Sequence, residues 1–280
     1  MELVKSFGSY LFSLGYSKNM VNNLPVYATS FLSFTGKNVE QVNVQDLQRF
    51  HNHLEVRPNR RRSFGGLSES YIRTNLYAVK LFFKSLCEKG VLSSNPLSNY
   101  ELPKVECEQR KVLTEHQIKQ LYATCENYRE RVLLGMYYSC GLRRNEGINL
   151  NLNDVDLKQG VLLVREGKGG KERKVPMSKQ FILDLECYLS FERSPKELHE
   201  KALLLHSRGG RLIDTNRFFK ELLFKANELG ENIPIQGVSL HNLRHSVATH
   251  LLHNGMNIYQ VKEFLGHASL ESTQIYTRPK

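Results

Sequence analysis

The sequence lacks several features that would place a protein in a membrane or outside the cell. No apolar run approaches the roughly 18 residues of a membrane span, and the longest, "VLLGMYYSC" at 132–140, is about half that length. The N-terminus carries Lys5 but no long apolar stretch with a small-residue cleavage site, so we expect no signal peptide. The five cysteines form no CxxC pair, which argues against a disulfide framework and a cysteine zinc site. These absences predict a cytoplasmic protein without membrane contact.

Two common enzyme motifs are also missing. The glycine-rich stretch "GKGGKER" at 167–173 is not a nucleotide-binding P-loop, which needs GxxxxGK followed by Ser or Thr. His241 and His245 have the four-residue spacing of a zinc protease, but Asn242 stands where that motif has its glutamate. Arg244 between the two histidines would also repel a divalent cation. The sequence therefore argues against a metal site.

Positive charge is what the sequence has in excess. Lys and Arg number 39 against 28 Asp and Glu, a formal net charge of +11. Such an excess favours a polyanionic partner, since each phosphate neutralised by a basic side chain releases counterions. The charge gathers in two stretches, "RPNRRR" at 57–62 and "GKGGKERK" at 167–174. Charge alone leaves nucleic-acid binding and a merely solvated surface equally open.

The first hundred residues are predicted to be helical. Helices are expected around 2–14 and 18–35, and Pro25 is expected to break the second. Apolar residues recur at helical spacing over 44–54 and over 72–86. These stripes indicate core packing between helices, so we expect a helical domain over residues 1–100.

A linker and a second domain are expected to follow. Residues 101–112 continue a proline-containing stretch with little apolar periodicity. Thr114 and Gln117 then have the spacing of a capping box, which predicts the start of a new helix. Strand-like runs at 161–165 and 173–177 flank the glycine-rich turn and predict a β-hairpin. We therefore expect a mainly α protein with a small β-hairpin or sheet (α+β) in its second domain, 113–280.

The stretch "SLHNLRHSVATHLLHNG" at 239–255 holds the most concentrated candidate chemistry. On a helix, His241 and Arg244 lie about 60° apart beside an apolar stripe, so both can point into a cleft from one helix edge. An arginine beside a histidine suits an anion, because a guanidinium grips two phosphate oxygens at once. His250 and His253 are interpreted as ordinary packing or surface histidines.

The remaining candidates are weak alone and specific together. Six residues stand in the order and at the spacing of one family: Arg143 in "GLRRNE", Lys168 in "GKGGKER", His241 and Arg244 in "HNLRH", His267 in "LGH", and Tyr276 nine positions later. Over its whole length the sequence resembles the tyrosine recombinases, which include the Xer proteins and phage-type integrases. The resemblance implies a helical DNA-clamping domain over 1–100 and a catalytic domain over 113–280.

The resemblance also implies a reaction and partners. In this family a tyrosine attacks a DNA phosphodiester, forms a 3′-phosphotyrosyl link and frees a 5′-hydroxyl. The 5′-hydroxyl of a partner strand reverses the step, so two DNA sites exchange strands without metal, ATP or another cofactor. Double-stranded DNA is the expected partner, with a homotetramer on two sites and a monomer or weak dimer when free.

The resemblance gives each residue of the set an expected role. Without a metal the protein must supply positive donors for the phosphoryl oxygens, and Arg143, Arg244 and His267 would do so. Tyr276 would be the nucleophile. Because a free tyrosine has a pKa near 10, His241 is the expected base.

Three further expectations concern residues around this set. Lys168 would give a proton to the leaving 5′ oxygen. Glu146 and His245 are expected to support the site, and Arg144 is expected to face solvent rather than DNA. Six basic residues are expected to contact DNA: Arg57, Arg60, Arg61, Arg62, Lys171 and Arg173.

Two alternatives and one departure stay open. The same residues would serve a type IB topoisomerase-like relaxation of one duplex, and the basic N-terminal helices alone would fit a non-catalytic, sequence-specific DNA-binding protein. Family members usually continue past the tyrosine into a tail that docks on a neighbouring subunit, whereas this chain ends four residues after Tyr276. Strand cleavage is therefore a firmer expectation than assembly. The sequence names neither the DNA site nor a role in chromosome-dimer resolution, integration, excision or inversion.

Overall fold

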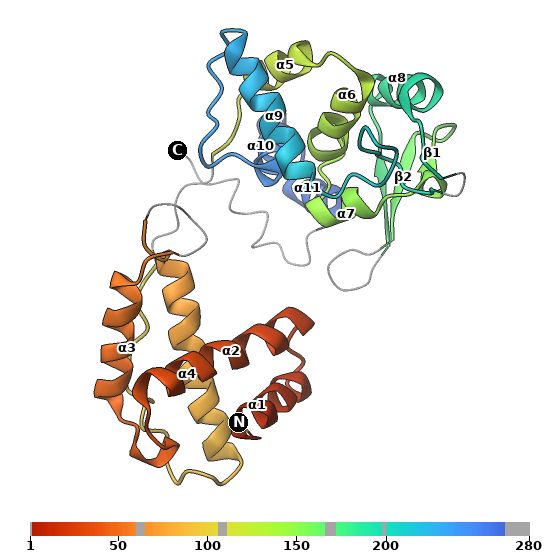
Figure 1. The fold of residues 1–280 in the computed structure, drawn as a ribbon. Helices are drawn as coiled ribbons and strands as arrows, with labels where there is room; N and C mark the ends of the chain where they lie inside the picture. Colours follow the sequence, from red (N-terminus) through yellow and green to blue (C-terminus); the bar gives the residue numbers. More distant parts are fainter. Residues whose placement is uncertain (1, 60–64, 106–110, 166–171, 198–199, 267–280) are drawn as a thin grey trace. The chain divides into compact units, whose positions relative to one another are not determined.

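The computed structural model describes residues 2–59, 65–105, 111–165, 172–197 and 200–266. It divides into two compact units, Met1–Glu108 and Gln109–Lys280. Figure 1 shows the helices of the first unit in red to orange and the second unit in green to blue. None of the described helices is long and apolar enough to cross a membrane.

The first unit is a helical bundle around an aromatic core. Its elements are α1 (Glu2–Ser13), α2 (Lys18–Thr35), a 3₁₀ turn (Val39–Gln41), α3 (Val44–Val56) and α4 (Glu69–Glu88). Helix α2 packs against α1, α3 and α4. Edge-on ring pairs fill the interior, such as Phe31 against Phe50 and Phe7 against Phe82. The predicted helices are therefore present, and their apolar stripes meet in one core.

The predicted break at Pro25 was wrong. Helix α2 runs through Pro25 without interruption, from its N-cap Ser17 to Gly36, whose φ of 62° ends it. A proline inside a helix costs about 3 kcal/mol. The two large apolar side chains that this helix buries, Leu24 and Phe31, offset that cost, since burying each is worth about 1.5–3 kcal/mol.

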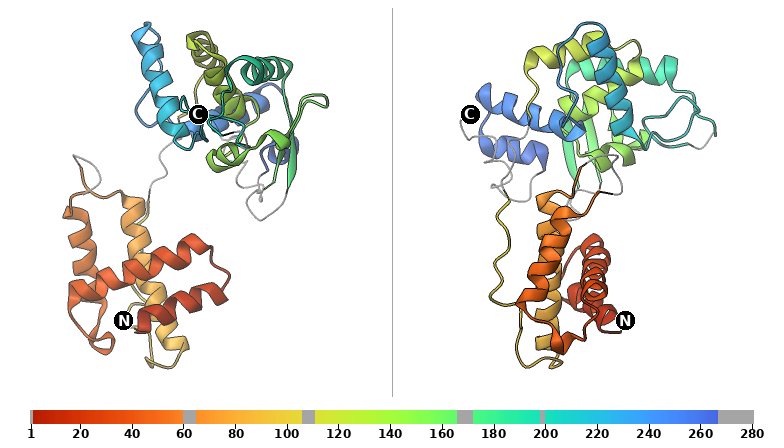
Figure 2. Two further views of the ribbon diagram at one scale, coloured as in Figure 1. Left: turned by 45° about the vertical axis from the view of Figure 1, so that its right-hand side comes forward. Right: turned by 60° about the vertical axis from the view of Figure 1, so that its left-hand side comes forward.

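The second unit combines seven α-helices of the described chain with one small sheet. The helices are α5 (Glu115–Thr124), α6 (Tyr128–Leu134), α7 (Arg144–Asn149), α8 (Lys179–Cys187), α9 (Thr215–Glu228), α10 (Leu240–His253) and α11 (Ile258–Leu265). Helix α5 begins with the predicted capping box, in which the Gln117 backbone N–H donates to Thr114 Oγ1 at 3.2 Å and Gln117 Oε1 accepts from the Thr114 N–H at 3.0 Å. Helices α10 and α11, blue in Figure 2, pack against each other.

The sheet contains the predicted hairpin and one further strand. Strands β2 (Val161–Val164) and β3 (Arg173–Pro176) pair antiparallel, with Val164 opposite Arg173. Strand β1 (Val155–Asp156) pairs with β2 and was not predicted, because two residues are too few to show a strand period. Figure 1 shows the sheet at one edge of the second unit. The mainly α class with a small antiparallel sheet is confirmed.

A π-helical turn follows α6 and leads the chain to the start of α7. It spans Gly135–Ser139, and the Cys140 N–H donates to the Gly135 carbonyl at 2.9 Å. A Cβ at Gly135 would lie 2.1 Å from the ring of Phe181, so only glycine fits there. Gly141 then turns the chain with φ of 56°, close to the helix end expected from the sequence. Helix α7 starts directly after this turn.

Candidate active site

Arg143 and Glu146 are held together at the start of α7. Arg143 is the N-cap residue, with extended backbone, and Glu146 is the third residue of the helix. The Arg143 N–H donates to Glu146 Oε2 at 2.8 Å, and Arg143 Nη1 donates to Oε1 at 2.7 Å. A carboxylate in the first turn also suits the partial positive charge of a helix N-terminus. The local sequence therefore fixes this pair.

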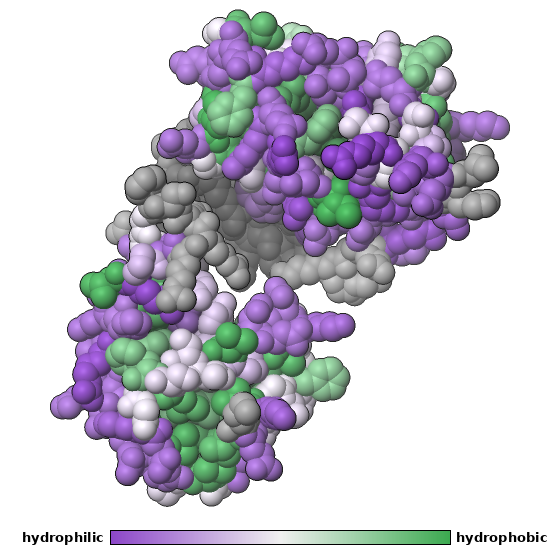
Figure 3. Space-filling model, viewed as in Figure 1, coloured by the Kyte–Doolittle hydropathy of each residue, from purple (hydrophilic) through white to green (hydrophobic). Residues whose placement is uncertain are grey.

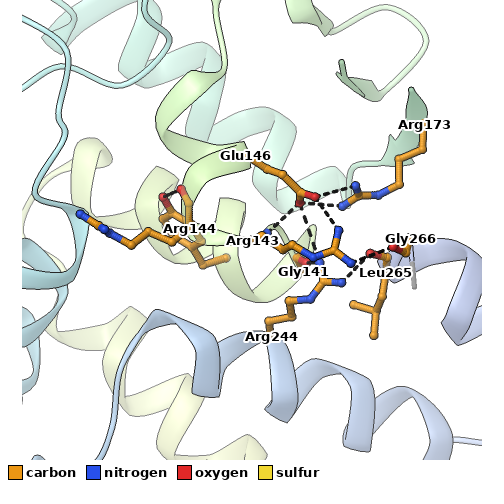
Figure 4. Close-up of polar contacts among 9 residues, drawn as sticks. Gly141, Arg143, Arg144, Glu146, Arg173, Arg244, Leu265 and Gly266 are labelled. Carbon is orange, nitrogen blue, oxygen red and sulfur yellow. Dashed lines mark hydrogen bonds and ion pairs between the residues drawn. The ribbon is translucent and has the colours of Figure 1, made fainter. Parts of the chain in front are cut away.

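Glu146 is buried, and three arginines surround its carboxylate. Arg173 from β3 forms a bidentate pair with it, Nη1 to Oε1 at 2.9 Å and Nη2 to Oε2 at 2.8 Å. Arg244 Nη1 lies 3.9 Å from Oε2, and the Glu146 side chain is only 3% exposed. Burial by itself would raise the pKa of Glu146, but the hydrogen bonds and charge of Arg173 and Arg143 outweigh it and lower the pKa to about 2. Figure 4 shows this arrangement.

The guanidinium groups of Arg143 and Arg244 meet at the end of α11. Arg244, on α10, is 1% exposed and donates to the carbonyls of Gly141 and Leu265. Arg143 Nη2 donates to the next carbonyl, that of Gly266, at 2.8 Å. Gly266, labelled in Figure 4, caps α11 with φ of 64° and directly precedes position 267 in the sequence. Two arginines far apart in sequence thus converge on one turn.

Helix α10, which carries Arg244, also carries four histidines. His241 is exposed, whereas His245 is buried, and their ring centroids are 4.3 Å apart at 77°. His250 is also buried, and its Nδ1 lies 2.9 Å from the Tyr138 hydroxyl. Burial lowers the pKa of His250. His250 is thus the packing histidine that the sequence indicated, and His253 lies exposed at the helix end.

The structure places some of the other candidates and leaves several undescribed. Arg144 is exposed, donates to the Ile213 carbonyl at 3.2 Å and points away from Glu146 in Figure 4. Arg57 is half-buried at the end of α3. The candidates outside the described residues are Arg60, Arg61, Arg62, Lys168, Lys171, His267 and Tyr276. Within the described residues, no group of three or more His, Cys, Asp or Glu could hold a metal ion.

Three side-chain contacts of β3 and α10 have no signal in the sequence. Arg173 was expected to contact DNA, but both of its Nη atoms bind Glu146, 27 positions away. Asn242 and Ser246, on α10, bind the start of the second unit: Asn242 donates to the Lys111 carbonyl, and Ser246 Oγ accepts from the Leu113 N–H, both at 2.8 Å. Side-chain pairs between distant elements leave no periodic pattern from which they could be predicted.

Comparison with known proteins places the chain in a family. The model of the phage integrase family matches residues 111–280. The chain is 31% identical to the tyrosine recombinase XerA of Pyrococcus horikoshii, over 99% of this chain and 89% of that protein. It is 34% identical to the tyrosine recombinase XerC of Oceanobacillus iheyensis, over 91% and 83% of the two chains.

A solved structure shares the fold at lower identity. The Tn1549 transposon integrase, in complex with circular intermediate DNA, superposes with a TM-score of 0.80 at 18% identity, covering 99% of this chain and 95% of that one. The fold, the family match and the two relatives agree. The chain therefore belongs to the phage integrase family of tyrosine recombinases.

Proposed function

We propose that this protein is a site-specific DNA recombinase that cleaves and rejoins DNA through a 3′-phosphotyrosyl intermediate, without metal or ATP. The observation that carries the proposal is the convergence of Arg143 and Arg244 on the Leu265–Gly266 turn, immediately before His267 in the chain. Family membership supports it, because the relatives are named tyrosine recombinases. A scissile phosphate beside this turn would replace the Leu265 and Gly266 carbonyls as the acceptor for two guanidinium groups that are already ordered.

Charge stabilisation is the first task of this site. A phosphoryl group in transfer spreads negative charge over its non-bridging oxygens, and fixed donors stabilise that charge without reorganisation. Arg143 and Arg244 are fixed by a buried carboxylate and by backbone carbonyls. His267 follows the turn that both arginines hold and would add a third donor. Removing one such donor typically slows the reaction about 10²–10³-fold.

Proton transfer is the second task. Tyr276 would attack the phosphorus and bond to it, while the bond to the 5′ oxygen breaks. The phenol must lose a proton, and exposed His241 would accept it directly or through water. The 5′ oxygen must gain one, which Lys168, between β2 and β3 in the sequence, would supply. Buried His245 packs edge-on against the His241 ring and would orient it.

The partner is double-stranded DNA, and the assembly is a homotetramer on two sites. The net charge of +11 supports a phosphate-rich partner, and the Tn1549 integrase of the same fold was solved with DNA. The first unit would act as the clamp. The basic residues that would contact the DNA backbone are Arg57, Arg60, Arg61, Arg62 and Lys171.

The test is covalent capture of a DNA strand. A target is first selected from random-sequence duplexes by binding to the full chain, and then nicked so that cleavage releases a short fragment. We expect a protein–DNA adduct on denaturing gels, formed equally in EDTA and lost in Tyr276→Phe. Binding without any adduct would instead favour the non-catalytic alternative. Relaxation of supercoiled DNA without sequence preference would favour the topoisomerase-like one.

A further inference from the structure

Arg173 occupies an unusual position for a basic residue next to a basic stretch of sequence. It is the first residue of β3, yet its side chain is only 13% exposed and points to Glu146 of α7. Each Glu146 oxygen accepts one hydrogen bond from Arg173 and one from Arg143. The plane of the carboxylate is therefore set by the two arginines together.

Arg173 also packs against the second partner of Arg143. A Cβ added at Gly266 would lie 2.8 Å from Arg173 Cδ and 2.9 Å from its Nε, so the Arg173 side chain lies directly on this turn. The Gly266 carbonyl accepts from Arg143 Nη2 at 2.8 Å. Arg173 thus contacts both groups that orient the Arg143 guanidinium, the carboxylate on one side and the α11 cap on the other.

A DNA phosphate has no ready access to Arg173. Both Nη atoms are used by Glu146, and the remaining donor, Nε, is buried without a hydrogen-bond partner in the described part of the chain. The neighbouring Lys174 is exposed, on the opposite face of the strand. A phosphate would have to displace a buried carboxylate to reach Arg173, whereas Lys174 offers its charge freely to solvent.

We propose that Arg173 is a positioning residue for strand cleavage, which fixes Glu146 and through it the guanidinium of Arg143. The role needs an arginine, because a planar fork holds both oxygens of a carboxylate and a lysine ammonium holds one point. The inference rests on the proposed function, since it requires Arg143 to act on a DNA phosphate. It replaces a direct DNA contact at position 173 with an indirect effect on the reaction.

The experiment measures cleavage and binding separately in the full chain. The probe is the nicked duplex selected with the wild-type protein, used at saturating concentration in single-turnover reactions. We expect Arg173→Lys to lower the cleavage rate constant by about 10- to 100-fold, the cost of a misplaced catalytic group, with an unchanged Kd for DNA. The matched control is Lys174→Gln, which removes a charge from the same strand and should leave the rate constant unchanged. Arg173→Lys with wild-type rate and weakened binding would overturn the inference in favour of a phosphate contact.

A double-mutant cycle with Arg143→Ala tests the route of the effect. If Arg173 acts through Arg143, Arg173→Lys slows the wild-type protein but not the Arg143→Ala protein, whose slow reaction is followed over hours. An equal slowing in both backgrounds would overturn the inference.

Two measurements check that each variant is folded: its circular dichroism spectrum and the fraction of the protein that reacts. A purely structural role would reduce that fraction and leave the rate constant of the reacting molecules unchanged, which would also overturn the inference. Failure of the proposed function is distinguishable, because the wild-type protein would then form no adduct.

Discussion

Glu146 is the residue at which the electrostatics of the site can be measured without DNA. Its carboxylate is buried against Arg143 and Arg173. Removing one partner of a buried ion pair costs about 3–5 kcal/mol, because the other charges stay buried without compensation. We therefore expect Glu146→Gln to lower the free energy of unfolding at pH 7 by about that amount, measured by urea denaturation. Glu221→Gln, at an exposed pair with Arg217, is the control and should cost no more than about 1 kcal/mol.

The same pair predicts a pH dependence. The pKa of Glu146 is lowered from its ordinary value of 4.5 to about 2 in the folded protein. A depressed carboxylate pKa stabilises the fold fully above the unfolded value, and this stabilisation is lost as the pH falls towards the folded value. The difference in unfolding free energy between wild type and Glu146→Gln should be constant above about pH 5.5 and shrink between pH 4.5 and 2. A difference independent of pH over this window would contradict the buried ionised carboxylate.

At the scale of residues, the sequence indicated which arginines lie together better than it indicated which side chains form pairs. The motif order indicated that Arg143 and Arg244 belong together, and the structure brings both to the α11 cap. The pairing of Arg173 with Glu146 could not be predicted, because β3 and α7 meet only through the tertiary fold. A basic side chain beside a basic stretch of sequence predicts a DNA contact, and its burial cannot be read from the sequence.

At the scale of elements, α10 joins the site to the start of the second unit. One side of this helix carries His241 and Arg244, and Ser246 Oγ accepts from the buried Leu113 N–H at 2.8 Å. An unsatisfied buried donor costs about 1–3 kcal/mol. Ser246→Ala should therefore lower the free energy of unfolding of the second unit by that amount.

Thr249→Ala is the matched control on the same helix. The Thr249 hydroxyl only donates to the His245 carbonyl one turn earlier, at 3.0 Å, so its loss should change stability by less than about 0.5 kcal/mol. Equal effects of the two substitutions in urea denaturation would contradict a specific role for the Leu113 contact.

Local sequence patterns predicted most of the regular helices and strands. The predictions failed where packing between distant residues outweighed the local pattern. The capping box at Thr114 and the hairpin of β2 and β3 are confirmed. Both could be predicted because they depend on residues close in sequence. Helix α2 continues through Pro25 because its buried face holds it in place. The π-helical turn at Gly135–Ser139 was not predicted, since its glycine is required by Phe181, far away in the chain.

At the scale of the whole molecule, each unit has its own hydrophobic core. The first unit buries a cluster of aromatic and aliphatic side chains from all four of its α-helices. A fragment of residues 1–105 should therefore fold alone, with helical circular dichroism and a cooperative thermal transition. A gradual loss of signal without a transition would show instead that this unit depends on the rest of the chain.

The properties of the whole molecule that are hardest to predict from the sequence are its partners and its assembly. Net charge favours DNA as a partner, but subunit contacts and the DNA site depend on surfaces that local patterns do not specify. On the face shown in Figure 3 the second unit is mostly hydrophilic, with apolar residues in separate spots. Because the whole chain carries a net charge of +11, its binding to DNA should weaken steeply as the salt concentration rises.

The most direct test of the whole account identifies the atom that joins protein to DNA. The adduct formed on the nicked duplex in EDTA is digested with protease and nuclease, and the nucleotide-bearing peptide is sequenced by mass spectrometry. We predict a peptide that contains Tyr276 with a phosphodiester on its phenolic oxygen, attached through the 3′ end of the cleaved strand. Attachment at another residue, through a 5′ phosphate, or only when a divalent metal is added would contradict the account.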